Sequence, residues 1–152
     1  MPTLHFTTNI EGPRETIFGL IADITQYNRW LPRSGAFGAV TQVSPTPVGP
    51  GTSYIDQGSS GAMKGSIIEY QPPTRITFEQ SMLVKFLVIS GILELHIQYT
   101  LEPVEHETHV NREVTLHLPG LLFGAQPIIA STIRRESKRL LQIMKRTIET
   151  HV

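Results

Sequence analysis

The sequence predicts an α+β fold in which a curved antiparallel sheet wraps around a long C-terminal helix. Residues 121–149 form one amphipathic stretch, in which apolar side chains recur at helical spacing and basic and amide side chains occupy the opposite face. The middle of the chain consists of short segments separated by proline and glycine, which is typical of an antiparallel meander. A long helix after a strand-rich body favours packing of the helix against the sheet, with any cavity between them.

One strand and two short helices are expected before the meander. Residues 4–10 alternate apolar and polar side chains, as a half-buried strand does. Pro13 suits the first turn of a helix, where its missing N–H costs nothing. Thr25 can cap a second short helix that carries Tyr27 and Trp30. We therefore expect two short helices between the first and second strands.

Six further strands are expected before the last helix. Their ranges are 37–43, 52–57, 63–70, 75–82, 92–102 and 108–118. This order of elements corresponds to a helix-grip domain, whose curved seven-stranded antiparallel sheet holds the final helix across its concave face. Because no internal repeat or linker interrupts the chain, residues 1–152 are expected to form one domain.

The composition argues against several classes of function. The 13 basic and 13 acidic residues cancel, so no overall field attracts nucleic acid. The absence of cysteine removes disulfides, thiolate nucleophiles and cysteine-bound zinc, and it fits a cytoplasmic protein. No signal peptide is expected, and the longest apolar run, residues 82–95, is too short and too interrupted to span a bilayer. We expect no cofactor and no metal, because His106 and His109 straddle a turn and lack a third ligand.

Several segments are similar to a known superfamily. Residues 10–18, 21–24 and 27–32 resemble the opening of START-like proteins of the SRPBCC superfamily, with a strand, a helix begun by proline, an aspartate and a tryptophan-proline end. Residues 48–52 resemble the glycine turn of these proteins, and residues 140–149 resemble their closing helix. The resemblance covers essentially the whole chain and is closest to the bacterial polyketide cyclase/dehydrase-like members. It implies the helix-grip fold, but the superfamily spans lipid carriers, steroid receptors, cyclases and chaperone cofactors.

Arg112 is the most informative polar residue, because strand alternation places it on the apolar side of the seventh strand. There it can bind a ligand carboxylate or enolate or polarise a ketone. It can also snorkel at the end of the sheet or pair internally with Asp56, Glu69 or Glu136. Asp56 and Tyr54 can act as an acid/base or hydrogen-bonding pair if their face of the third strand turns inward. The alternative register turns Asp56 outward.

The other expected ligand contacts come from the strands and the last helix. Tyr99 shares the apolar face of the sixth strand, where its hydroxyl either points into the cavity or fills the core, and His96 is expected to point to solvent. Trp30 and Tyr27 are expected to close one end of the pocket. No catalytic residue is assigned. The expected ligand-binding residues are Arg112, Asp56, Tyr54, Tyr99, Trp30, Phe78, Leu95, Ile97, Val114, Ile129, Ile133 and Leu140.

Two apolar segments are unusual for the surface of a protein without membrane spans. Residues 83–89 are expected to connect the fifth and sixth strands, and residues 121–129 lead into the last helix. Together they can form an apolar entrance to the cavity, a dimer contact or a patch that touches a membrane transiently. Alternatively, they pack against each other as a small satellite core.

These features favour a protein that binds a hydrophobic small molecule, such as a lipid, a polyketide or an aromatic compound, in a cavity between the sheet and the last helix. The resemblance implies an alternative, an enzyme that cyclises or dehydrates a polyketide, with Asp56 and either Arg112 or Tyr54 as the acid/base pair. A third hypothesis is a protein-interaction module of the chaperone-cofactor type, which predicts a filled core. The chain is expected to be a monomer or a homodimer.

Overall fold

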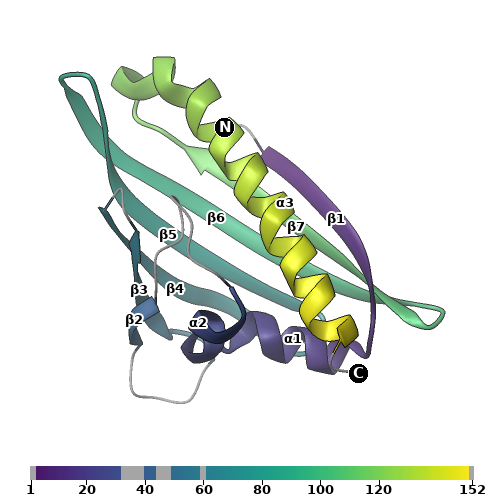
Figure 1. Cartoon of the computed structure of the whole chain (residues 1–152). Coiled ribbons are helices and arrows are strands. Elements are labelled where there is room, and N and C mark those ends of the chain that lie inside the picture. The colour runs from purple at the N-terminus through teal and green to yellow at the C-terminus, as the bar shows by residue number, and fades with distance from the viewer. Residues whose placement is uncertain (1–2, 32–39, 44–48, 59–60, 151–152) are drawn as a thin grey trace.

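The computed structural model describes residues 3–31, 40–43, 49–58 and 61–150. These residues form an α+β fold with an antiparallel sheet and a long C-terminal helix, as the sequence predicted (Figure 1). The strands are β1 (Thr3–Glu11), β2 (Val40–Val43), β3 (Ser53–Gly58), β4 (Gly61–Gln71), β5 (Arg75–Phe86), β6 (Ile89–Val104) and β7 (Glu107–His117). The helices are α1 (Arg14–Ala22), α2 (Tyr27–Trp30) and α3 (Gln126–Thr150), with 3₁₀ segments η1 (Ile24–Gln26) and η2 (Gly120–Ala125).

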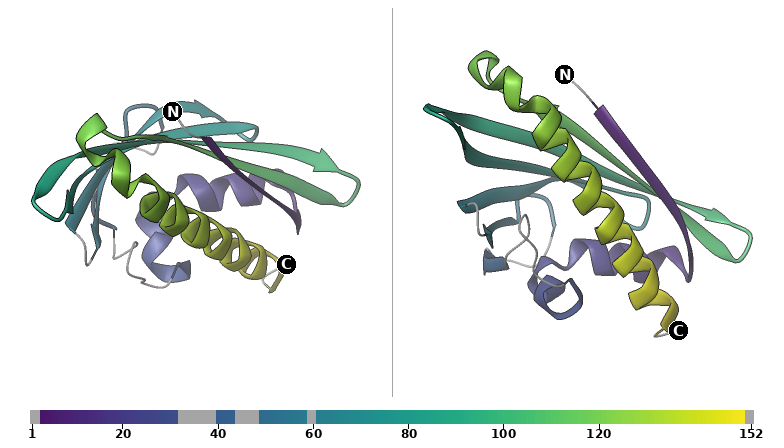
Figure 2. Two further views of the ribbon diagram at one scale, coloured as in Figure 1. Left: turned by 90° about the horizontal axis from the view of Figure 1, so that it is seen from above. Right: turned by 45° about the horizontal axis from the view of Figure 1, so that its top comes forward.

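The described strands form one sheet in the order β1-β7-β6-β5-β4-β3-β2. Strands β2 to β7 each pair with their neighbours in sequence, whereas β1 closes the far edge by pairing antiparallel with β7. Helix α3 crosses the concave face of the curved sheet, and α1 and α2 lie at one end of the same face (Figures 1 and 2). The space beneath α3 is therefore bounded by the sheet on one side and by the short helices at one end.

The core consists of the inward-facing side chains of the strands and the apolar side of α3. His96 is exposed on the outer face of β6, while the side chains before and after it turn toward α3, as expected. Along α3, Leu140, Met144 and Ile148 are buried at intervals of one turn. The buried side chains of β6 are Leu93, Leu95, Ile97, Tyr99 and Leu101.

The expected connection at residues 83–89 is wrong. Strand β5 continues to Phe86 and β6 begins at Ile89, so only Leu87 and Val88 form the turn between them. The physical reason is that leucine, valine, phenylalanine and isoleucine favour extended, paired backbone. The segment has no glycine or proline that would favour a longer turn. The hairpin that results projects beyond the rest of the sheet (Figure 1).

Two other boundaries differ from the sequence-based expectation. Thr25 does not cap α2: it lies in η1, and its hydroxyl donates to the Asp23 carboxylate. The last helix begins as the 3₁₀ segment η2, and regular α-helix starts only at Gln126, where Pro127 fits the first turn. Of the strand expected at 37–43, residues 37–39 lie outside the described residues.

Candidate functional site

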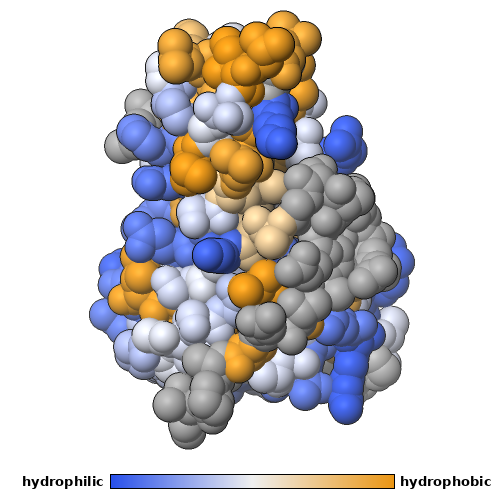
Figure 3. Space-filling model, turned by 90° about the vertical axis from the view of Figure 1, so that its left-hand side faces the viewer, coloured by the Kyte–Doolittle hydropathy of each residue, from blue (hydrophilic) through white to orange (hydrophobic). Residues whose placement is uncertain are grey.

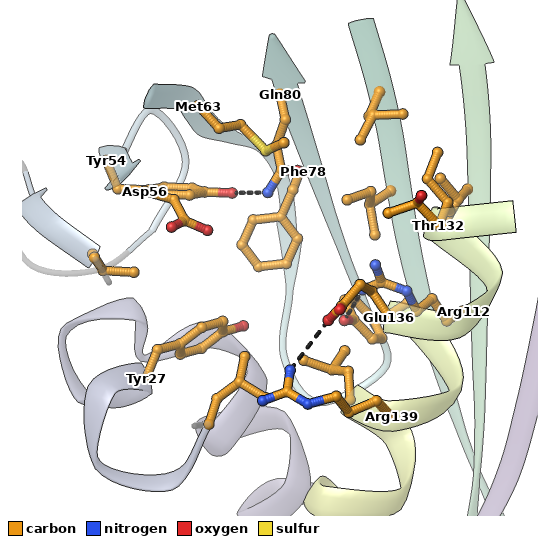
Figure 4. Close-up of a pocket in the computed structure, with 18 residues that line it drawn as sticks. Tyr27, Tyr54, Asp56, Met63, Phe78, Gln80, Arg112, Thr132, Glu136 and Arg139 are labelled. Carbon is orange, nitrogen blue, oxygen red and sulfur yellow. Dashed lines mark hydrogen bonds and ion pairs between the residues drawn. The ribbon is translucent and has the colours of Figure 1, made fainter. Parts of the chain in front are cut away.

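A cavity of about 160 Å³ lies between the concave face of the sheet, α2 and the N-terminal half of α3 (Figure 4). Its walls are mainly apolar, and its polar groups come from β3, β5, β6, β7, α2 and α3. The lining residues are Tyr27, Leu31, Val40, Tyr54, Asp56, Met63, Phe78, Gln80, Leu95, Ile97, Tyr99, Arg112, Val114, Thr132, Ile133, Glu136, Arg139 and Leu140.

Most of the residues expected to bind a ligand line this cavity, and two do not. Trp30 packs edge-on against Tyr27, with 5.2 Å between ring centroids, and does not reach the lining. Ile129 packs against the core one helical turn before Ile133. The residues that line the cavity as expected are Arg112, Asp56, Tyr54, Tyr99, Phe78, Leu95, Ile97, Val114, Ile133 and Leu140.

An aromatic wall runs across the strands on one side of the cavity. Phe78 lies between Tyr54 and Tyr99, at centroid distances of 6.3 and 6.1 Å, and both pairs are edge-to-face. Tyr54 also accepts a hydrogen bond from the side-chain amide of Gln80. Its ring covers Gly65 on β4, where a Cβ atom would lie only 2.4 Å from the ring. The absence of a side chain at Gly65 therefore allows Tyr54 to lie flat against the sheet.

Arg112 is held at the edge of the cavity by hydroxyl groups. Its Nε donates to Ser137 Oγ of α3 at 3.1 Å, and its Nη1 donates to the hydroxyl of Tyr99. Its Cζ also lies 5.3 Å from the centroid of the Tyr99 ring, within cation–π distance. A guanidinium carries five N–H donors, so these two bonds leave donor capacity on the side that faces the cavity.

The internal ion pairs expected for Arg112 are not found among the described residues. Glu69 accepts from the Thr77 hydroxyl at 2.8 Å and lies 3.7 Å from Arg75. Glu136 pairs instead with Arg139, three residues further along α3, at 3.1 Å. None of the salt bridges within the described part of the chain involves Arg112. Its positive charge is thus fixed in place without being cancelled by a directly bonded carboxylate there.

Three tyrosine hydroxyls lie around the cavity, and all three are held in the neutral form. Burial raises the pKa of Tyr27 and Tyr54 well above the ordinary value, and it also raises the pKa of Tyr99, although nearby Arg112 acts in the opposite direction on Tyr99. The hydroxyl of Tyr27 donates to the carbonyl oxygen of Ile21, which fixes its direction. At physiological pH the three phenols are therefore neutral, and the charged side chains of the lining are Arg112, Asp56, Glu136 and Arg139.

The register of β3 turns Asp56 and Tyr54 inward. Tyr54 lies opposite Gly65 and Asp56 lies opposite Met63, so both side chains share the face that lines the cavity (Figure 4). The inward alternative of the two that the sequence left open is the one observed. Asp56 on β3 and Arg112 on β7 both project from the concave face of the sheet. They lie at opposite ends of the cavity, with the aromatic wall between them.

The sequence reasoning missed several lining residues. Gln80 had a signal, because it alternates with Phe78 on β5. Thr132, Glu136 and Arg139 lie at the border of the apolar stripe of α3, where helical periodicity alone does not separate inward from outward positions. Also missed were Leu31, Val40 and Met63, whereas Tyr27, expected at the end of the pocket, does line the cavity.

The described residues contain neither a metal-binding cluster nor a membrane-spanning helix. No group of three or more histidine, aspartate or glutamate side chains in them could hold a metal ion. No helix within the same residues has the length and apolarity needed to cross a membrane. The cavity is therefore the candidate binding site within the described residues.

Comparison with known proteins supports the fold and connects it to one family. The family model for polyketide cyclase / dehydrase and lipid transport matches residues 1–149. A START superfamily protein from Mycobacterium smegmatis superposes with a TM-score of 0.70 at 12% identity, over 99% of each chain. Ara h 8.0201 gives a TM-score of 0.70 at 14% identity over 98% of each chain.

The solution structure of the Aha1 dimer from Colwellia psychrerythraea gives a TM-score of 0.68 at 14% identity, over 98% of this chain and 97% of that one. No curated protein matches the sequence significantly. At these identities, likeness to the solved structures demonstrates the fold alone.

Proposed function

Because the chain belongs to the polyketide cyclase / dehydrase and lipid transport family, we propose that its cavity binds a hydrophobic small molecule. The ligand is a lipid, a polyketide or an aromatic compound that carries a carbonyl or carboxylate group. The observation that carries this proposal is the position of Arg112, a cation held by two hydroxyl groups at the edge of a mainly apolar cavity. The protein is expected to act in the cytoplasm, as a monomer or a homodimer.

The size of the cavity limits how much of the ligand it encloses. Its volume of about 160 Å³ is close to that of an engineered protein cavity of about 150 Å³ that binds benzene. Pockets that enclose drug-sized ligands are larger, about 300–1,000 Å³. A single ring or a branched end of the ligand is therefore enclosed, and the remainder extends out of the cavity.

Arg112 supplies the polar end of the site in this proposal. Because Ser137 and Tyr99 hold the guanidinium in one orientation, little side-chain entropy is lost when a ligand oxygen accepts its remaining N–H groups. A hydrogen bond to a charged group contributes about 1.5–3 kcal/mol. Loss of that bond corresponds to a roughly ten- to hundredfold weaker affinity.

The first test is mass spectrometry of an organic extract of the natively purified protein, which identifies any bound ligand. The second is calorimetric titration with 2-naphthoate, an aromatic carboxylate. Replacement of Arg112 by methionine is expected to weaken 2-naphthoate binding about tenfold or more. The matched control, Arg134→Met on the exposed face of α3, is expected to bind like the parent protein.

A neutral ligand separates the loss of one contact from collapse of the cavity. The uncharged 2-methylnaphthalene should bind the parent protein and the Arg112→Met variant with similar affinity, because it makes no charged hydrogen bond. Equal affinity of parent and variant for 2-naphthoate would contradict the role given to Arg112. Failure of both compounds to bind the parent protein would contradict the binding site itself.

A second candidate function is the cyclisation or dehydration of a polyketide, and the inward position of Asp56 favours it. The Asp56 carboxylate would remove a proton from the carbon between two carbonyl groups, and Arg112 would stabilise the negative charge on the enolate oxygen. Turnover of a poly-β-ketone surrogate that Asp56→Asn abolishes, while 2-naphthoate binding is retained, would establish an enzyme. A protein-interaction module is less well supported, since it predicts a filled core.

A further inference from the structure

The end of the molecule beyond the cavity carries exposed apolar side chains. We define the apolar tip as the β5–β6 turn, the segment η2 and Ile128 at the start of α3. Hydrophobic residues gather over this end in the space-filling view, at the top of Figure 3. Single exposed apolar residues are common on proteins, but a contiguous group of this kind marks an interaction site. The exposed fractions are 100% for Val88, 89% for Leu87, 79% for Leu121, 68% for Phe123 and 59% for Ile128.

The backbone conformation of the β5–β6 turn indicates that Leu87 and Val88 do not stabilise the fold. Phe86 pairs with Ile89, so Leu87 and Val88 alone make the turn, and Leu87 adopts a φ of 58°. This left-handed conformation is unfavourable for a leucine and is normally supplied by glycine or asparagine in two-residue hairpins. A strained leucine and a fully exposed valine therefore occupy positions where other residues would fold better. Contact with something outside the chain explains both.

The two parts of the apolar tip form one continuous surface. Gly91 on β6 has no side chain, and a Cβ atom there would lie 2.9 Å from Leu122 and 3.0 Å from Pro119. Leu122 is accordingly buried against the hairpin, while its neighbours Leu121 and Phe123 point outward. The satellite core that the sequence suggested is thus present in part, and its role is to fix the exposed side chains relative to one another.

The charged residues nearest the apolar tip along the chain are Lys85 and Arg134, and both are basic. Residues 82–93 and 114–135 contain Lys85, Arg134 and Arg135, which are all exposed, and they contain no aspartate or glutamate. These segments therefore hold three of the 13 basic residues of the chain and none of its 13 acidic residues. The tip thus combines exposed apolar groups with basic side chains nearby.

The opposite end of the molecule is acidic. Five glutamates and one arginine, Arg14, line a groove formed by the end of β1, the start of α1, the β6–β7 turn and the end of α3, where Lys145 also pairs with Glu149. The C-terminal end of α3 lies there, whereas its N-terminal end lies at the apolar tip (Figure 1). The chain is neutral overall but polarised along α3, so a negatively charged surface orients the tip toward itself. These glutamates are Glu11, Glu15, Glu105, Glu107 and Glu149.

We propose that the apolar tip docks onto the surface of an anionic lipid bilayer. Leu87, Val88 and Phe123 enter the boundary between the headgroups and the acyl chains, and Lys85 and Arg134 lie at the level of the lipid phosphates. This surface is distinct from the ligand cavity and does not depend on which ligand the cavity takes. Its position beyond the cavity also places the protein so that an apolar ligand could pass between bilayer and cavity.

The charge distribution favours a bilayer over a second copy of the chain. A two-fold symmetric contact through the tip would place Lys85, Arg134 and Arg135 close to the same three residues of the partner, and like charges in an interface oppose association. Anionic phospholipids supply the complementary charge. A bilayer also accommodates the aliphatic side chains of a projecting turn, because it needs no surface shaped to fit them. The bilayer therefore accounts for both the apolar and the cationic residues.

The test is co-sedimentation with lipid vesicles of phosphatidylcholine alone or with one quarter phosphatidylglycerol. The parent protein is expected to bind the vesicles that contain phosphatidylglycerol and to bind pure phosphatidylcholine much more weakly. The double substitution Leu87→Gly with Val88→Asn supplies the residues that this turn prefers, so the fold should be retained. Binding to the anionic vesicles should fall at least about tenfold, because two buried aliphatic side chains are lost.

Another two-residue hairpin of the sheet, between β6 and β7, provides a matched control. Glu105 and His106 form the β6–β7 turn at the acidic end, and Glu105 has a φ of 57°. The substitutions Glu105→Gly with His106→Asn should leave vesicle binding unchanged. The thermal midpoint of each variant, together with its affinity for 2-naphthoate, shows whether fold and cavity are intact.

Three results would overturn the proposal. One is failure of the parent protein to sediment with either kind of vesicle. Another is equal binding of the parent protein and the Leu87→Gly, Val88→Asn variant. The third is a dimer in sedimentation equilibrium that this variant dissociates, which would make the tip a contact between copies of the chain. Because 2-naphthoate binding is measured separately, none of these results decides the function of the cavity.

Discussion

The buried hydroxyl groups of Tyr27, Tyr54 and Tyr99 add polar groups to the cavity without adding negative charge to that of Asp56 and Glu136. Each is removed from water and takes part in a hydrogen bond, with the Ile21 carbonyl, the Gln80 amide or the Arg112 guanidinium. A phenolate in this position would cancel the positive charge of Arg112, so the raised pKa values preserve the ability of the site to attract an electron-rich oxygen. The residues around Arg112 therefore matter to its function even where they do not touch a ligand.

The raised pKa values predict that Tyr27, Tyr54 and Tyr99 remain neutral in the folded chain at a pH where an exposed phenol ionises. The stability that they contribute is complete below the ordinary pKa of about 10 and is lost above it, because the unfolded chain then releases protons that the folded chain retains. Ultraviolet absorbance of phenolate during an alkaline titration should show these phenols ionising together with unfolding.

Substitution of Tyr54 by phenylalanine is the control for this titration, because it should reduce the part of the absorbance change that accompanies unfolding. Ionisation of all the tyrosines well before unfolding would contradict the burial of their hydroxyls.

At the level of single residues, the sequence predicted the direction in which side chains point better than the residues to which they hydrogen-bond. Alternation along β6 and β7 has only two possible outcomes, so one apolar face was enough to place Tyr99, Arg112 and Val114 correctly at the cavity. The partner of Arg112 could not be predicted in this way. Ser137 reaches it from α3, and which turn of that helix lies over which strand depends on three-dimensional packing.

The pairing of β3 with β4 shapes the aromatic wall of the cavity. Tyr54 lies on Gly65 because no side chain separates the ring from the sheet. Any side chain at residue 65 must push the ring away from β4, toward the space that a ligand would occupy. A residue that does not line the cavity therefore controls its width.

Substitution of Gly65 by alanine is predicted to reduce stability by about 1–3 kcal/mol, because the added methyl group overlaps the Tyr54 ring and forces it to move. The affinity for 2-naphthoate should change as well. Denaturant unfolding and calorimetric titration measure the two effects.

Gly19→Ala is the matched control, since a Cβ atom at this position in α1 meets no other atom within 4 Å. It should instead stabilise the helix by up to about 1 kcal/mol. A Gly65→Ala variant as stable as the parent would show that Tyr54 does not depend on this close approach.

Element types could be predicted well, and element ends less well. Long, strongly patterned segments such as β6 and α3 were recognised from their periodicity. The β5–β6 turn was not recognised, because the usual glycine, asparagine or proline is missing and the strand-forming residues continue through it. An apolar turn of this kind is informative, since it departs from the local rules for reasons that lie outside folding.

At the scale of the whole molecule, one cluster of polar contacts joins the last turns of α3 to the end of strand β1. Glu149 near the end of α3 accepts hydrogen bonds from the backbone amide of Glu11 at 3.0 Å and from Lys145 at 2.7 Å. Lys145 also donates to the carbonyl oxygen of Asn9 at 2.7 Å. These bonds attach the last helix to the edge strand β1 and so help to hold α3 across the sheet.

This contact predicts an acid-dependent loss of stability. The hydrogen bonds from the Glu11 amide and from Lys145 lower the pKa of Glu149 below its ordinary value of about 4.5. The contribution of this carboxylate is therefore complete above that value and is lost as the pH falls through the lowered pKa. The Glu149→Gln variant should have a lower urea midpoint than the parent protein at neutral pH, and the difference should shrink in acid.

Glu94→Gln serves as the control for this measurement, because Glu94 is exposed on the outer face of β6. Its effect on the urea midpoint should be small at either pH. A difference for Glu149→Gln that persists unchanged in strong acid would show that the carboxylate charge is not its cause.

The topology of the sheet also has a consequence for the order in which the molecule assembles. Strand β1 precedes the other strands in the sequence, yet its partner β7 lies about a hundred residues later, with Thr3 opposite Thr115. The hairpins from β3 to β7 are local and can form early, whereas the pairing of β1 requires β7, and α3 follows all seven of these strands. Until α3 packs, the concave face of the sheet lacks the cover of this helix. The finished cavity, with Arg112 bonded to Ser137, therefore requires residues from both ends of the described chain to be in place.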